Sequence, residues 1–223
     1  MGRFDYEGFP VRDEIRQLHA GSWEGIARAG SHWSGAERVE IARQARAARA
    51  ARGEPPWLRT RLPDADGRLP ADAVDAARTI AADAHRIDAA WAAKKIAALG
   101  DAAYVELASV VVTVTAIDAF GEALGTAHAA LPEPEPGAPD GARLEDAADA
   151  GAYVPMLDPF VGPNVGRALS LVPEANRLFM QNVMAMYGTR GGGFFDMVWD
   201  GPLARPQAEL LAARVSALNE CFY

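Results

Sequence analysis

Apolar and polar residues follow one another along most of this chain at the spacing of amphipathic helices. Near the N-terminus, small or apolar residues recur every three or four positions, at Val11, Ile15, Leu18, Ser22 and Ile26. That period places them on one face of a helix. The same pattern predicts helices over about 35–52, 70–82, 88–99, 101–124, 164–170, 174–187 and 206–218. The chain is therefore predicted to be all-α.

Two of these helices carry further signals. Ser34, with Glu37 three residues later, has the pattern of a capping box before the helix that begins at Gly35. The segment 101–124 is rich in β-branched residues, and a strand over 109–117 is the alternative interpretation. We favour a helix there, because the apolar residues keep helical spacing and no hairpin turn lies nearby.

The segment 131–150 has a different composition, with a proline at every second position from Pro132 to Pro136. Such a segment is extended and semi-rigid, and it cannot form a core of its own. It predicts a boundary between an N-terminal helical half, 1–130, and a C-terminal helical half, 151–223.

Charge and composition narrow the functional classes. The 223 residues carry a net charge of -8, and an acidic protein does not suit phosphate binding, so nucleic acid is not an expected partner. An uninterrupted apolar run of about 18 residues, as a membrane span requires, does not occur. The N-terminus also lacks a secretory signal pattern, so we expect a cytoplasmic protein that does not contact a membrane.

Several charged residues and histidines have a structural interpretation. Four arginines, at 43, 46, 49 and 52, lie three residues apart, which is typical of a solvated helix face or of pairing with carboxylates across a subunit contact. Glu106 and Asp118 lie on one apolar segment, and the sequence shows no partner for either. The four histidines have no regular spacing with one another or with carboxylates, so no metal site is expected.

Glu209 and the single cysteine, Cys221, lie twelve residues apart. On one straight helix this spacing would separate them by about 18 Å along the axis and about 120° around it. Asn219 is a preferred N-cap residue, so we expect the helix to stop near Leu218 and a new helix to hold Cys221 in its first turn. The positive end of that helix would lower the thiol pKa. The alternatives are a buried, inert Cys221 and a Glu209 that only favours its helix dipole.

The stretch from Gln207 to Tyr223 resembles the catalytic segment of the alkylhydroperoxidase D-like and carboxymuconolactone decarboxylase superfamily. Redox-active members carry a glutamate, eleven residues, a cysteine, two residues, a second cysteine, three residues and a histidine. Glu209 and Cys221 match the first two positions, and Asn219 before the cysteine is also typical. The segments 32–38, 101–107, 112–118 and 154–158 are similar to peroxidase-related members with two halves.

The resemblance implies an alkylhydroperoxidase D-like fold and a thiol-dependent peroxidase that reduces alkyl hydroperoxides in antioxidant defence. Cys221 would be the redox thiol and Glu209 part of its proton relay. The resemblance implies no cofactor, a thiol reductant as partner, and a homo-oligomer made of dimers. The second cysteine and the histidine would follow Tyr223.

Two other functions stay open. One is a cofactor-free decarboxylase or lactone-processing enzyme that relies on a histidine, as in the other branch of the superfamily. The other is a non-catalytic helical oligomerisation protein in which Cys221 is buried.

Overall fold

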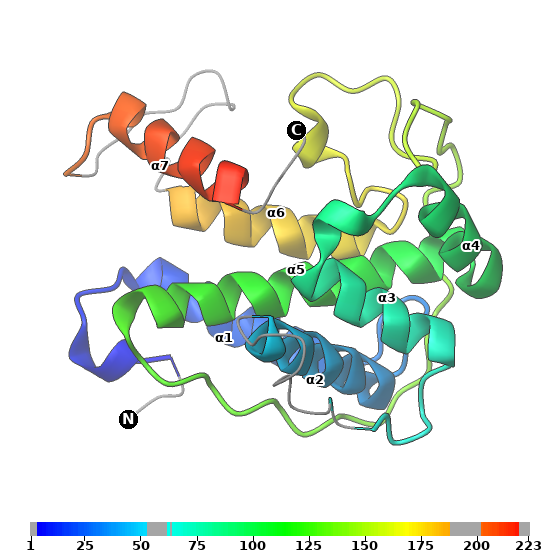
Figure 1. Cartoon of the computed structure of the whole chain (residues 1–223), viewed down its shortest axis with the longest axis horizontal. Helices are drawn as coiled ribbons and strands as arrows, with labels where there is room; N and C mark the ends of the chain where they lie inside the picture. Colours follow the sequence, from blue (N-terminus) through cyan, green and yellow to red (C-terminus); the bar gives the residue numbers. More distant parts are fainter. Residues whose placement is uncertain (1–3, 53–61, 63, 188–201, 219–223) are drawn as a thin grey trace.

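The computed structural model describes residues 4–52, 62, 64–187 and 202–218, and these residues form an all-α fold (Figure 1). The helices are α1 (Asp13–Ala27), α2 (Gly35–Ala51), α3 (Ala71–Ala82), α4 (Ala89–Leu99), α5 (Asp101–Leu124), α6 (Pro173–Tyr187) and α7 (Arg205–Leu218). Single turns of 3-10 helix cover Tyr6–Gly8, Ala84–Arg86 and Asn164–Gly166. The described residues form no strand beyond one isolated bridge between Ala148 and Met156. The prediction of an all-α chain is confirmed.

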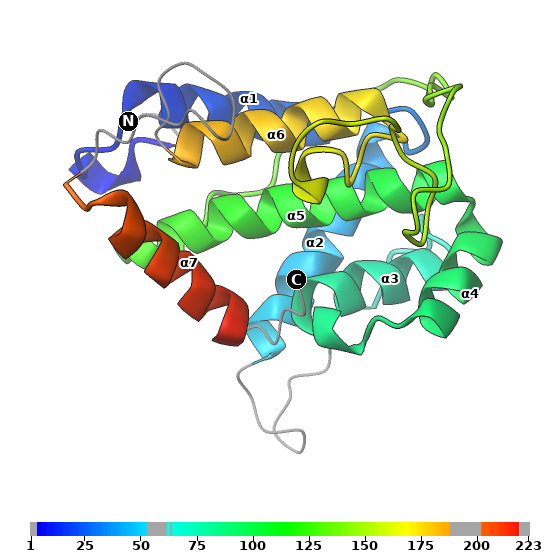
Figure 2. The same ribbon diagram turned by 90° about the horizontal axis from the view of Figure 1, so that it is seen from above.

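The longest helix, α5, lies at the centre of the fold (Figure 2) and contacts α1, α2, α3, α4 and α6. Three of its apolar residues, Leu107, Val111 and Val114, are almost completely buried. Among the described helices, α5 alone has the length and mean hydropathy of a membrane span. A core helix shares both properties, and here the buried face also carries the charged residues Glu106 and Asp118.

The ends of α2 and α4 show why these helices begin where they do. The Ser34 hydroxyl accepts the Glu37 backbone N–H, and the Glu37 carboxylate accepts the backbone N–H of Ser34 at 2.8 Å. This is the predicted capping box, which satisfies two backbone donors at once. Asp88 caps α4 in the same manner by accepting the Trp91 backbone N–H at 2.8 Å.

Two apolar clusters hold the helices together. The larger one contains Trp23, Ile41 and Leu107 and joins α1, α2, α3 and α5. The smaller one contains Tyr104 of α5 together with Leu171 and other residues near the start of α6. Because burial of apolar surface is the main driving force of folding, these clusters hold the helices around α5, where α1 and α6 also contact each other.

The segment 131–150 is irregular, as predicted, but backbone hydrogen bonds attach it to the helical part of the fold. Backbone hydrogen bonds of 2.8 Å join Glu135 N–H to the Ala27 carbonyl and Leu144 N–H to the Leu171 carbonyl. Beyond it, α6 packs against α1 and α5. The division into halves 1–130 and 151–223 remains a prediction.

The predicted helix over 164–170 is wrong. Only one 3-10 turn forms there, over Asn164–Gly166. Gly162 lies at φ +141 and Pro163 follows it, and Arg167 leaves the helical region at φ -118. This backbone cannot continue into an α-helix.

Candidate functional site

Glu209, the predicted partner of the thiol, lies in the second turn of α7. Its side chain is 45% exposed, and Arg205 lies one turn before it, with Nε 3.5 Å from Glu209 Oε1. The helix begins at Arg205 because Gln207 Oε1 accepts the Ala204 backbone N–H at 2.8 Å, which is half of a capping box. The carboxylate is therefore accessible to a small substrate from solvent.

Cys221 and Asn219 lie outside the described residues, so the pairing of Glu209 with Cys221 stays a prediction. The described part of α7 ends at Leu218, which is nine residues, or about 13.5 Å along the axis, from Glu209.

One face of α7 is apolar and exposed. Leu210 is 70% exposed, and Leu211, Val215 and Leu218 are each more than half exposed. None of the fourteen described residues of this helix is buried. Single exposed apolar residues are common, but four on one short helix form an exposed apolar surface.

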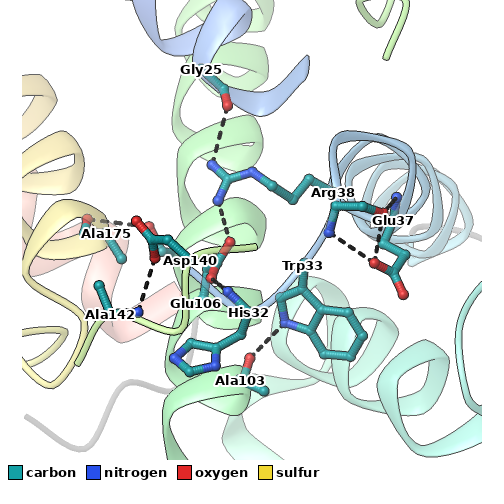
Figure 3. Close-up of polar contacts among 12 residues, drawn as sticks. Gly25, His32, Trp33, Glu37, Arg38, Ala103, Glu106, Asp140, Ala142 and Ala175 are labelled. Atoms are coloured by element: carbon teal, nitrogen blue, oxygen red, sulfur yellow. Dashed lines mark hydrogen bonds and ion pairs between the residues drawn. The ribbon is translucent and has the colours of Figure 1, made fainter. Parts of the chain in front are cut away.

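A second group of polar residues surrounds Glu106 inside the helical bundle (Figure 3). Glu106 is 1% exposed; its Oε1 accepts a hydrogen bond from Arg38 Nη1, and its Oε2 accepts the His32 backbone N–H at 2.6 Å. Arg38 Nη2 also donates to the Gly25 carbonyl at 3.3 Å. A buried charge is costly unless it is paired and hydrogen-bonded, and these contacts supply both conditions.

Gly30 makes this ion pair possible. A Cβ atom at this position would overlap Glu106 Oε1 and Arg38 Nη1. The Gly30 backbone N–H donates to the Trp33 carbonyl at 2.9 Å, so the turn that carries His32 closes directly over the two charges. Only a residue without a side chain fits there.

The second buried carboxylate of α5, Asp118, also has a partner. Arg46 holds it with two hydrogen bonds of 2.8 Å, and Arg49 pairs with Glu122 at 2.7 Å. Arg43 pairs with Glu40 on its own helix at 2.7 Å. The interpretation of the arginine stripe as a solvated face or a subunit contact is therefore wrong for these three residues, which pair with carboxylates of the same chain.

His19 is buried among aromatic rings and shares a hydrogen bond with the Tyr6 hydroxyl through Nδ1. Burial lowers the pKa of His19 from 6.5 to about 4, because the charged imidazolium would lose its hydration. Burial likewise raises the pKa of Tyr6 to about 12. Both groups are thus neutral near pH 7, and the pair packs among aromatic rings as a structural element.

The described residues contain no cluster of histidine, cysteine and carboxylate side chains that could hold a metal ion. Comparison with models of known protein families, with curated proteins and with solved structures found no match. The function of the chain is therefore inferred from its own residues.

Proposed function

We propose that this chain is a thiol-dependent peroxidase with an alkylhydroperoxidase D-like fold, and that it reduces alkyl hydroperoxides. The observation that carries the proposal is the spacing between Glu209, an exposed carboxylate on α7, and Cys221, the single cysteine. The all-α architecture and the helical segment from Glu209 to Leu218 are consistent with it.

The chemistry begins with the Cys221 thiolate. Its sulfur attacks one oxygen of the hydroperoxide, the O–O bond breaks, and the alkoxide leaves and takes up a proton to become an alcohol. The sulfur becomes a sulfenic acid. A thiol of the reductant partner then attacks that sulfur and releases water, and a second thiol breaks the mixed disulfide and restores Cys221.

Glu209 has its role before this attack. A thiol is a weak nucleophile until it loses its proton, and an exposed carboxylate can accept that proton through a water molecule or a histidine. Arg205 lies beside Glu209 on the same helix, with 3.5 Å between Arg205 Nε and Glu209 Oε1.

The test uses the whole chain, tert-butyl hydroperoxide and dithiothreitol. Cys221→Ser should abolish peroxide consumption without changing thermal stability. Glu209→Gln should slow alkylation of Cys221 at pH 7 by about 100-fold, the size of a general-base contribution. Glu133→Gln, which changes another exposed carboxylate, should leave the rate unchanged. If Cys221 reacts no faster than free cysteine, the proposal is wrong.

A non-catalytic role in oligomerisation is the second candidate, because the leucines of α7 are exposed. In that case α7 packs against α7 of a second copy, and the peroxide assay shows no activity. Sedimentation of the wild type and of a Leu211→Glu variant measures this association directly.

A further inference from the structure

The large apolar side chains that are exposed in the described part of the chain gather in two places, apart from Phe9. One place is α7 together with Leu203, just before it. The other is the irregular segment 150–168, which exposes Tyr153, Leu157, Val161 and Val165. Figure 1 shows both places on the same side of the molecule, with α7 in red and the segment in yellow. Apolar residues that gather on a surface, rather than occurring singly, mark an interaction site.

The segment 150–168 also forms a surface pocket of about 300 Å³. Small and apolar residues line it, among them Ala152, Met156, Val165 and Ala168, and no residue of α7 lines it. A cavity of about 150 Å³ in another protein holds benzene, a molecule of about the size of a leucine side chain or slightly larger. The pocket therefore has room for about two leucine side chains.

The apolar residues of α7 have the spacing of a helix that binds in a groove. Leu211, Val215 and Leu218 lie at positions i, i+4 and i+7, and helices bind apolar grooves through one face with residues at this spacing. Each of the three side chains is more than half exposed. Leu211 and Leu218 are two turns apart, or about 10.5 Å along the axis, so α7 presents a row of apolar side chains that a second surface can cover.

The segment around the pocket is held in place by its own hydrogen bonds. The Arg167 guanidinium donates to the Leu157 carbonyl at 3.0 Å and to the Asp158 carboxylate at 2.7 Å. Ala148 and Met156 exchange two backbone hydrogen bonds of 2.9 Å. A preorganised surface loses little conformational freedom when it binds, so this segment is suited to receive a helix.

The two surfaces carry opposite charges. Four carboxylates and no lysine or arginine lie in the segment 145–166: Glu145, Asp146, Asp149 and Asp158. Asp158 pairs with Arg167, while the other three are exposed and form no ion pair within the described part of the chain. On α7, Arg205 lies beside Glu209, and Arg214 is exposed and has no ion pair among the described residues. Two copies of a chain with a net charge of -8 repel each other, so a contact between them needs such local complementarity.

We propose that this protein forms a two-fold dimer in which α7 of each copy binds the pocket of segment 150–168 on the other copy. The leucines of α7 fill the pocket, and Arg214 meets the carboxylates beside it, of which Asp149 directly precedes the pocket residue Ala150. Both surfaces lie on one side of the molecule (Figure 1), so a two-fold axis that passes between them forms both contacts at once. Packing of α7 against α7 would leave the pocket empty. The dimer does not depend on the peroxidase function, because it needs neither Glu209 nor Cys221.

Sedimentation velocity of the whole chain over a range of concentrations measures the dimer. Arg214→Glu and Asp149→Lys should each raise the dimer dissociation constant at least about tenfold, since each places like charges at the contact. The double variant should recover most of the affinity, because it exchanges the two charges. Glu133→Lys makes the same change at an exposed carboxylate outside the pocket and should dimerise like the wild type.

The pocket is tested separately by Ala152→Leu, which fills it and should also weaken the dimer at least about tenfold. Ala142→Leu, at an exposed alanine outside the pocket, is its control. Circular dichroism checks that each variant is folded. A wild-type chain that sediments as a monomer at every concentration would overturn the proposal. Weakening by Arg214→Glu without weakening by folded Asp149→Lys and Ala152→Leu would show that α7 binds another surface, and the proposal would then be wrong.

Discussion

Replacing Gly30 with alanine would place a methyl group against both charges of the Arg38–Glu106 pair. The backbone at Gly30 does not have a positive φ, so the effect would come from the overlap and not from backbone strain. The pair must separate, and Glu106, at 1% exposure, has no water to replace Arg38. Breaking a buried ion pair in this way costs about 3–5 kcal/mol. That is a large part of the roughly 5–15 kcal/mol that stabilises a typical domain.

Gly21→Ala is the matched control, because the same change there meets no atom within 4 Å. In the interior of α1 it should stabilise the protein by about 0.5–1 kcal/mol. Urea unfolding followed by far-UV circular dichroism gives both free energies. Gly30→Ala should thus lower the free energy of unfolding, and Gly21→Ala should raise it. If the free energy of unfolding of Gly30→Ala stays within about 1 kcal/mol of the wild-type value, the Arg38–Glu106 ion pair does not have the expected effect on stability.

Two further predictions concern pH and helix capping. The pKa of His19 is 6.5 in the unfolded chain and about 4 in the fold, so the unfolded state binds the extra proton between these values. The free energy of unfolding should therefore fall by about 3 kcal/mol as pH decreases from 6.5 to 4. His19→Gln should remove this part of the pH dependence, and an unchanged slope would contradict the assignment. Ser34→Ala breaks the capping box of α2 and should lower stability by about 1 kcal/mol in thermal unfolding; Ser216→Ala, inside α7, is its control and should be near neutral.

Most of the helices could be predicted because their signals are local. The capping box at Ser34 and Glu37 and the glycine at position 100 lie within a few residues of the helix ends that they define. The prediction of a helix rather than a strand over 109–117 is confirmed, although the segment is rich in β-branched residues. The helical spacing of its apolar residues outweighs the intrinsic preference of β-branched residues for strands. The prediction of a helix over 164–170 is wrong because the backbone leaves the helical region at Arg167, after a single 3-10 turn.

The pairs inside the bundle could not be predicted, because they depend on tertiary structure. Glu106 and Arg38 are 68 residues apart, and Asp118 and Arg46 are 72 apart. A sequence shows that a charge lies on an apolar helix, but it does not show which helix faces it. The role of Glu209 stays a prediction, which rests on its spacing to Cys221 and on the family resemblance that this spacing carries.

The ion pairs between α2 and α5 have a consequence for how the chain selects one structure. Three arginines of α2 meet three carboxylates of α5 in the same order along both helices: Arg38 with Glu106, Arg46 with Asp118 and Arg49 with Glu122. The contact face of α2 is rich in alanine, at positions 42, 45 and 48, and such a smooth surface would tolerate several registers. A slip of one turn, about 5.4 Å, would leave buried carboxylates without cations. We infer that these pairs act as a register lock, which excludes near-native arrangements rather than adding to the stability of the native one.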